Sequence, residues 1–178
     1  MKTLVVNLFG VPGAGKSTAA AYIFSQLKMT GFNAELITEF AKDKVWEENK
    51  EVFKNQAYIF GKQSFKMTRC DGKVSVIITD SPLPLSIFYN SDPRLTENFN
   101  KSVMDVFNSF NNINYLIKRV KPYNPAGRHQ TEAESDALAT PIENLLKDRG
   151  IEYTCVDGDI YGYNEILAEV QIMLEGLA

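Results

Sequence analysis

Cysteine is scarce in this chain of 178 residues, which has only Cys70 and Cys155, far apart and outside any C-x-x-C pair. We therefore expect free thiols in a reducing cytoplasm rather than a disulfide framework. No apolar run is long enough to cross a membrane, and the short run near the start is interrupted by Asn7, so we expect no targeting segment. There is no basic block and the net charge is −3, which argues against a broad electrostatic surface for nucleic acid.

What the chain does have is an ordinary globular composition, with 44% hydrophobic and 23% charged residues. Its length suits one domain with a sizeable buried core, and no internal repeat or low-complexity tract divides it. We therefore predict a single domain over residues 1–178.

The strongest signal is the pattern G-x-x-x-x-G-K-[ST] within residues 10–18. It follows the apolar run 3–9 and precedes helix-forming residues, and in this strand-turn-helix context the pattern predicts binding of a triphosphate such as ATP. Lys16 can reach the β- and γ-phosphates, and Ser17 can offer its hydroxyl to Mg²⁺. The backbone and the helix N-terminus complete the phosphate cradle; we expect it to be formed by Gly10, Gly13, Ala14, Gly15 and Thr18.

Strand-like and helix-like segments alternate along the rest of the chain. Strands are expected at about 3–9, 33–38, 74–79, 114–118 and 151–156, and helices at about 16–29, 41–50, 54–69, 96–111, 131–149 and 163–174. This alternation predicts an α/β fold with a mainly parallel sheet. Because ligands bind at the carboxyl ends of parallel strands, the residues that follow the strands should face one crevice.

Two carboxylates follow predicted strands. Asp80 ends the third strand, where it can hold Mg²⁺ next to Ser17, although an Asp before Pro82 can also be a simple turn cap. Glu39 ends the second strand, where it can accept the proton of an attacking hydroxyl or merely favour a helix start. We favour Asp80 as the metal ligand and Glu39 as the base, with Asp80 as the competing base.

A basic loop bearing Pro and Gly follows the fourth strand, at about 119–130. Such a loop can close over a triphosphate, exclude water and neutralise charge, although a solvated surface loop is the simpler interpretation. We expect Arg128 to be the lid arginine and Arg119 to bind the nucleotide, with Lys121 and His129 as weaker candidates. Asp157, which follows the fifth strand, completes the predicted nucleotide-binding set.

An acceptor pocket between the second and third strands is a further expectation. Its walls would be aromatic, formed by Phe40, Trp46, Tyr58, Phe60 and Tyr89. Gln56 and Gln63 can hydrogen-bond the edge of a base, as surface glutamines in general can. Aromatic residues on helices are more often core than pocket, so the pocket is a hypothesis.

With these residues in place, the chain resembles the small P-loop kinases, and especially the AAA-labelled group that includes the nicotinamide riboside kinase domain, the deoxynucleoside kinases and phage-encoded P-loop kinases. The stretches that carry the resemblance are 10–18, 39–42, 56–63, 77–82 and 121–128. The resemblance implies a P-loop NTPase three-layer sandwich with strand order 2-3-1-4-5, a base at Glu39, metal assistance from Asp80 and a lid around Arg128. It also implies an ATP- and Mg²⁺-dependent kinase in the cytoplasm, or in the host cytoplasm if a phage encodes it.

Three functions are left open by the sequence. The favoured one is transfer of the γ-phosphate of ATP to a small nucleoside- or nucleotide-like acceptor. The second is a phage-type kinase that phosphorylates hydroxymethylated pyrimidine bases in DNA, and the third is a non-catalytic regulatory ATP-binding module. A GTPase is disfavoured, because Lys118-Arg119-Val120-Lys121 stands where N-K-x-D would be needed. We expect no membrane partner and leave a homodimer open.

Overall fold

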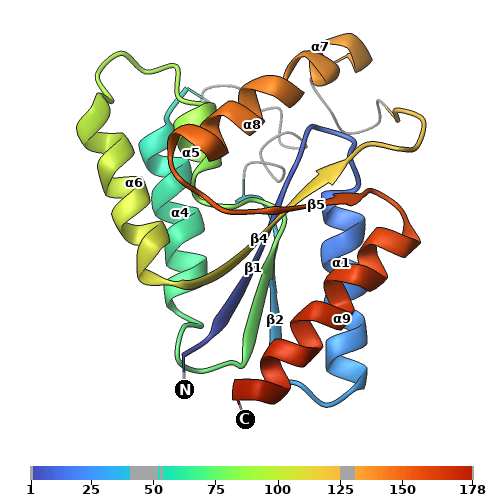
Figure 1. The fold of residues 1–178 in the computed structure, drawn as a ribbon. Helices are drawn as coiled ribbons and strands as arrows, with labels where there is room; N and C mark the ends of the chain where they lie inside the picture. Colours follow the sequence, from blue (N-terminus) through green and yellow to red (C-terminus); the bar gives the residue numbers. More distant parts are fainter. Residues whose placement is uncertain (1, 41–51, 53, 125–130, 178) are drawn as a thin grey trace.

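A parallel sheet forms the middle layer of the computed structural model, which describes residues 2–40, 52, 54–124 and 131–177 (Figure 1). Its strand order is β2-β3-β1-β4-β5. All four strand pairings are parallel. The predicted strand order is therefore confirmed, and the sheet, expected to be mainly parallel, is parallel throughout.

The strands are β1 (Leu4–Phe9), β2 (Ala34–Ile37), β3 (Val76–Thr79), β4 (Asn111–Lys118) and β5 (Thr154–Asp157). Every residue of β1 and β3 is buried, as expected of parallel strands that helices cover on both faces. Asn7 of β1 is in register with Thr79 of β3 and Asn114 of β4. The central strands therefore carry the chain to the same edge of the sheet, where the predicted site residues follow.

Helices cover both faces of the sheet (Figure 1). On one face α1 (Lys16–Met29) packs against α9 (Ile160–Leu177). The other face carries α4 (Gln56–Thr68), α5 (Leu85–Phe88), α6 (Glu97–Ser109), α7 (Glu132–Ala137) and α8 (Ala139–Asp148). The helices bury apolar residues four positions apart, such as Ile23 and Leu27 of α1, and this spacing keeps one face toward the sheet.

One predicted helix, at 131–149, is two helices in the structure. Its start is confirmed, because Thr131 and Glu134 form the predicted capping box. Pro141 explains the division: it has no N–H to donate to the carbonyl of Ala137, and its ring crowds that carbonyl. The chain therefore ends α7 at Ala137 and begins α8 two residues later.

Other boundaries differ by a few residues. β4 begins at Asn111 rather than near 114, because this polar segment pairs with β1, opposite Leu4, in a way that an apolar pattern does not reveal. The helix expected at 41–50 lies outside the described residues. None of the helices in the described part of the chain combines the length and the low polarity that a membrane span requires.

Candidate functional site

The loop between β1 and α1 is closely surrounded by backbone and side chains. Gly10, Gly13 and Gly15 have φ angles of 143°, 82° and 107°, which L side chains rarely adopt. A Cβ atom at Gly10 would lie 2.6 Å from the carbonyl oxygen of Ile117 in β4, and one at Gly15 would collide with the Tyr163 hydroxyl. The backbone conformation therefore favours glycine at all three positions, and the neighbouring strand and helix also require it at Gly10 and Gly15.

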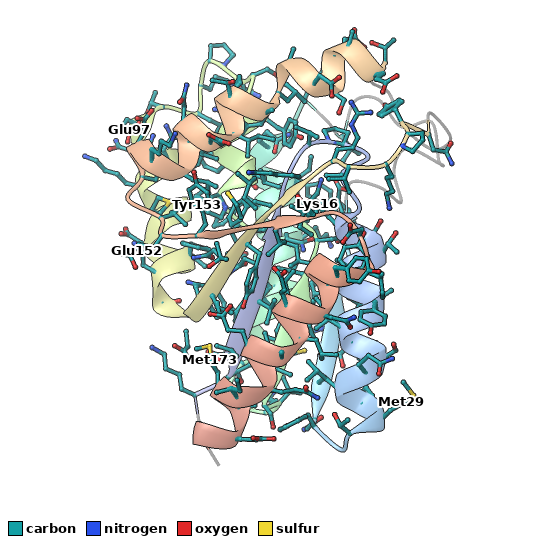
Figure 2. The ribbon with its side chains drawn as sticks, turned by 45° about the vertical axis from the view of Figure 1, so that its right-hand side comes forward. Lys16, Met29, Glu97, Glu152, Tyr153 and Met173 are labelled. Atoms are coloured by element: carbon teal, nitrogen blue, oxygen red, sulfur yellow. The ribbon has the colours of Figure 1, made fainter. Side chains whose placement is uncertain are left out.

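Lys16 is the first residue of α1 and its side chain folds back over the loop. Its Nζ donates hydrogen bonds to the carbonyl oxygens of Gly10 at 2.8 Å and Val11 at 3.1 Å. Figure 2 shows Lys16 at the end of α1 that meets the carboxyl edge of the sheet, with Met29 at the far end. Gly15 caps the helix without a side-chain hydrogen bond, so the first N–H groups of α1 remain suited to an anion.

The turn between β5 and α9 supports this loop from a second side. The Tyr163 hydroxyl donates to the carbonyl oxygen of Gly158 at 3.0 Å and lies 3.4 Å from that of Gly15. Gly158 is itself fixed to the end of β4, since its N–H donates to the carbonyl oxygen of Lys118 at 2.8 Å. No role of Tyr163 could be predicted from the sequence, because no local pattern indicates that α9 reaches the loop.

A carboxylate connects the ends of β2 and β3. Asp80 is only 6% exposed, and its Oδ1 accepts the backbone N–H of Glu39 at 3.0 Å. Gln63 of α4 makes a second connection: its amide donates to the Thr79 hydroxyl and accepts the N–H of Phe40, both at 3.3 Å. The Asp80 carboxylate is thus bound to the backbone of Glu39, and Gln63 has a structural role that the sequence did not indicate.

Tyr89 lies within the electrostatic reach of Glu39. Its pKa is raised to about 12, first because burial disfavours the charged phenolate and second because of the negative charge of Glu39. The Phe40 ring meets the Tyr58 ring edge-on at 5.6 Å between centroids, whereas Phe60 pairs with Phe99 of α6. Of the five predicted pocket aromatics, Tyr89 therefore lies near Glu39, Phe40 and Tyr58 contact each other, Phe60 packs against Phe99, and Trp46 lies outside the described residues.

The predicted lid cations have different surroundings. The Arg119 side chain, 12% exposed, forms ion pairs with Glu132 and Asp136 of α7, and hydrogen bonds to these two carboxylates raise its pKa. Its guanidinium carbon also lies 5.3 Å from the centroid of the Tyr123 ring. Arg128 and His129 lie outside the described residues.

Two other residues follow strands at this edge. The Lys121 ammonium borders the loop, since a Cβ atom at Gly15 would lie 3.1 Å from its Nζ. Asp157 is exposed at the end of β5, where it is in register with Lys118. Lys121, a weaker candidate from the sequence, thus comes closer to the phosphate loop than its sequence position alone indicated.

Oxygen donors suited to a hard cation follow β1 and β3. The Ser17 side chain is exposed in the first turn of α1, and Asp80 follows β3, the strand that pairs with β1. A hydroxyl and a carboxylate fit Mg²⁺, which usually takes few protein ligands and completes its shell with phosphate oxygens and water. The described residues contain no group of three or more His, Cys, Asp or Glu side chains able to hold a metal.

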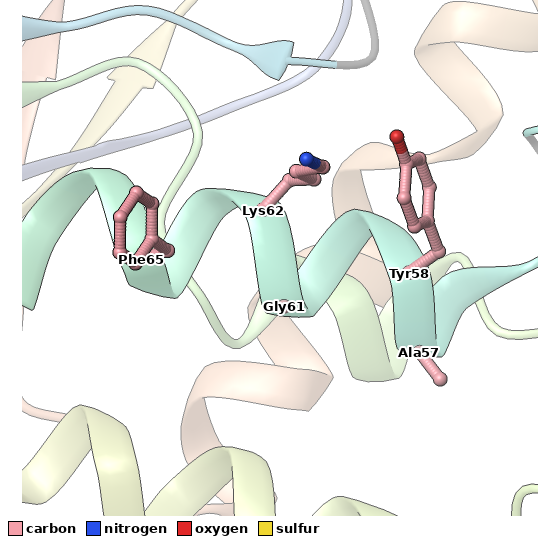
Figure 3. Close-up of a pocket in the computed structure, with 5 residues that line it drawn as sticks. All are labelled: Ala57, Tyr58, Gly61, Lys62 and Phe65. Carbon is pink, nitrogen blue, oxygen red and sulfur yellow. The ribbon is translucent and has the colours of Figure 1, made fainter.

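A surface pocket lies elsewhere, along the outer side of α4. Its lining residues all belong to that helix: Ala57, Tyr58, Gly61, Lys62 and Phe65 (Figure 3). Tyr58, a predicted wall of the acceptor pocket, lines it, whereas none of the predicted catalytic, nucleotide-binding or metal-binding residues does. The chemistry is therefore assigned to the phosphate loop and the ends of the strands.

The loop, its lysine and the 2-3-1-4-5 sheet define a P-loop NTPase with the fold of the small P-loop kinases. The chain belongs to the AAA domain family, whose model matches residues 5–161.

Solved structures share this fold at low sequence identity. A thymidylate kinase from Ehrlichia chaffeensis aligns with a TM-score of 0.65 and 10% identity, over 96% of this chain and 99% of that one. A deoxyadenosine kinase from M. mycoides, with the products dCMP and a flexible dCDP bound, aligns with a TM-score of 0.57 and 19% identity, over 94% and 98%. No curated protein sequence matches the chain.

Proposed function

We propose that the protein is an ATP-dependent kinase that transfers the γ-phosphate to a nucleoside- or nucleotide-like acceptor with the help of Mg²⁺. The observation that carries the proposal is the hydrogen bond between the Asp80 carboxylate and the N–H of Glu39, 3.0 Å long, at the same sheet edge as the phosphate loop. This bond holds the backbone of Glu39 beside Asp80, so that a second acidic residue stands at this edge, where a transfer to an acceptor hydroxyl would need a base. Further support comes from the fold, shared with a deoxyadenosine kinase whose structures have dATP, or dCMP and a flexible dCDP, bound.

Each residue would have a distinct role in the transfer. Lys16 would move its ammonium from the carbonyl oxygens of Gly10 and Val11 to the β- and γ-phosphates. Glu39 would accept the proton of the attacking hydroxyl, held in place by the hydrogen bond from its own N–H to Asp80. Ser17 and Asp80 would hold Mg²⁺, which when bound would supply positive charge to the transferring group. Arg128, Arg119 and Asp157 are proposed to bind the nucleotide from the lid and from β5.

The test is an acceptor screen with labelled ATP that includes nucleosides, nucleotides, nicotinamide riboside and hydroxymethylated DNA. We expect one acceptor class to stimulate ADP formation, and Lys16→Ala to abolish the stimulation. Glu39→Gln should lower kcat by about 10²- to 10⁴-fold, the usual contribution of a general base. Glu35→Gln makes the same change of charge on β2 outside the site and should behave as wild type.

One outcome would overturn the proposal, and another would change only the identity of the base. If no acceptor changes the rate of ADP formation while ATP binds, the protein is a regulatory module. If Glu39→Gln retains full activity while Asp80→Asn loses it, a kinase is supported but its base is Asp80 rather than Glu39.

A further inference from the structure

A buried serine of α7 contacts the phosphate loop from far along the chain. The Ser135 hydroxyl donates to the carbonyl oxygen of Pro12 at 2.7 Å, although 123 positions separate the two residues. Ser135 is completely buried. A buried hydroxyl needs a partner, and here that partner is the loop that the sequence pattern assigns to the triphosphate.

This hydrogen bond fixes the orientation of one peptide group in the loop. The described part of the chain has no cis peptide bonds, so the carbonyl of Pro12 and the N–H of Gly13 point in opposite directions. With the carbonyl directed at Ser135, the Gly13 N–H is directed away from α7. The N–H groups of such glycine-rich loops are the donors that cradle phosphates.

Helix α7 is itself held at several points. The capping box of Thr131 and Glu134 fixes its first turn. Arg119, which directly follows β4, forms ion pairs with Glu132 and Asp136, so that its partners stand on either side of Ser135 in the sequence. The serine is therefore held in place from the end of β4, and its hydroxyl is not free to follow a loop that changes shape.

We propose that Ser135 is a positioning residue for triphosphate binding: its hydroxyl holds the Pro12–Gly13 peptide so that the Gly13 N–H is available to a phosphate before the ligand arrives. The proposal rests on the proposed function only in taking ATP as the ligand. Arg119, predicted from the sequence to bind the nucleotide itself, supports this arrangement through α7. Without the hydroxyl, the peptide can rotate and the loop must be reordered when ATP binds.

The experiment compares Ser135→Ala with a control that loses a similar bond far from the loop. The Thr3 hydroxyl is also completely buried and donates to the carbonyl oxygen of Val74, likewise at 2.7 Å. Thr3→Val keeps the shape of the side chain and removes that bond at the opposite end of β1, together with the bond that the hydroxyl accepts from the N–H of Gly72. Calorimetric titration with ATP and Mg²⁺ should give a Kd about tenfold higher for Ser135→Ala, the effect of one net hydrogen bond. Thr3→Val should bind ATP as wild type does.

A spectroscopic readout separates positioning from loss of stability. In ¹⁵N-labelled protein, the Gly13 amide signal of the ligand-free state should shift in Ser135→Ala and stay in place in Thr3→Val. Ser135→Cys keeps the size of the side chain and a weak donor, so its Kd for ATP and the shift of its Gly13 amide signal should lie between those of wild type and Ser135→Ala. If Ser135→Ala does not fold, Ser135→Cys tests the positioning role in its place. Wild-type ATP affinity in Ser135→Ala, or equal weakening in Thr3→Val, would overturn the proposal.

The kinase proposal can fail independently of this one. If ATP binding depends on Ser135 but no acceptor stimulates ADP formation, the kinase proposal is refuted and the positioning role of Ser135 is supported. If an acceptor stimulates ADP formation but Ser135→Ala and Ser135→Cys bind ATP with normal affinity, the kinase proposal is supported and the positioning role is refuted.

Discussion

Gly15→Ala tests how closely α9 supports the phosphate loop. The substitution has two costs. The first is backbone strain, since an L residue at a φ of 107° is disfavoured by about 1–2 kcal/mol. The second is steric: the new Cβ atom would collide with the Tyr163 hydroxyl and lie 3.1 Å from the Lys121 ammonium. Moving Tyr163 would break its 3.0 Å hydrogen bond to Gly158, so we add about 1–3 kcal/mol for the crowding and the lost bond.

Gly31→Ala is a control for the first cost alone. Gly31 has a comparable φ of 93° just after α1, and a Cβ atom there would have nothing within 4 Å. In urea unfolding, Gly15→Ala should therefore lose about 1–3 kcal/mol more than Gly31→Ala. In ATP titrations only Gly15→Ala should bind more weakly, because only its loop is distorted.

A double substitution identifies the colliding group. Tyr163→Phe removes the hydroxyl, so the loss of stability in Gly15→Ala with Tyr163→Phe should be smaller than the sum of the two single losses. If Gly15→Ala and Gly31→Ala cost the same, or if the two losses simply add, the support that we assign to α9 is refuted.

Three further predictions concern charge and capping. Glu39→Gln should lower the pKa of Tyr89 from about 12 while leaving it above 10, because burial is the larger cause of the shift. A titration of Tyr89 followed by NMR measures the change, and an unchanged pKa would contradict the position of Glu39 near Tyr89. The pKa of Glu97 is lowered to about 2, chiefly by its hydrogen bond from Arg149, so its contribution to stability is present above pH 4.5 and is lost as the pH falls toward 2. Glu97→Gln should therefore lower the free energy of unfolding near pH 7 and make it depend less on pH between 4.5 and 2, and an unchanged pH dependence would contradict this role. Thr131→Ala should cost about 1 kcal/mol by removing the cap of α7, seen as a lower Tm, and an unchanged Tm would contradict the capping role.

Features that depend on neighbouring residues could be predicted from the sequence. The glycine-rich loop, the first helix and the capping box at Thr131 and Glu134 each arise from residues a few positions apart, whose chemistry limits the local backbone. The alternation of strands and helices predicted the parallel sheet for the same reason. Pro141 was also visible in the sequence, but the predicted helix ran through it because the prediction rested on the capping box at its start and Gly150 at its end.

Only the tertiary structure decided how these local pieces meet. Ser135 reaches Pro12, Tyr163 reaches the carbonyl oxygen of Gly15, and Asp80 accepts the N–H of Glu39, over separations of 123, 148 and 41 positions. No spacing rule connects residues so far apart, because their contacts depend on where whole helices pack on the sheet. Arg119 shows the same limit: its position after a strand was visible in the sequence, but its ion pairs with Glu132 and Asp136 of α7 depend on how α7 packs. The sequence determined that a triphosphate loop is present, and the packing determined what holds that loop in shape.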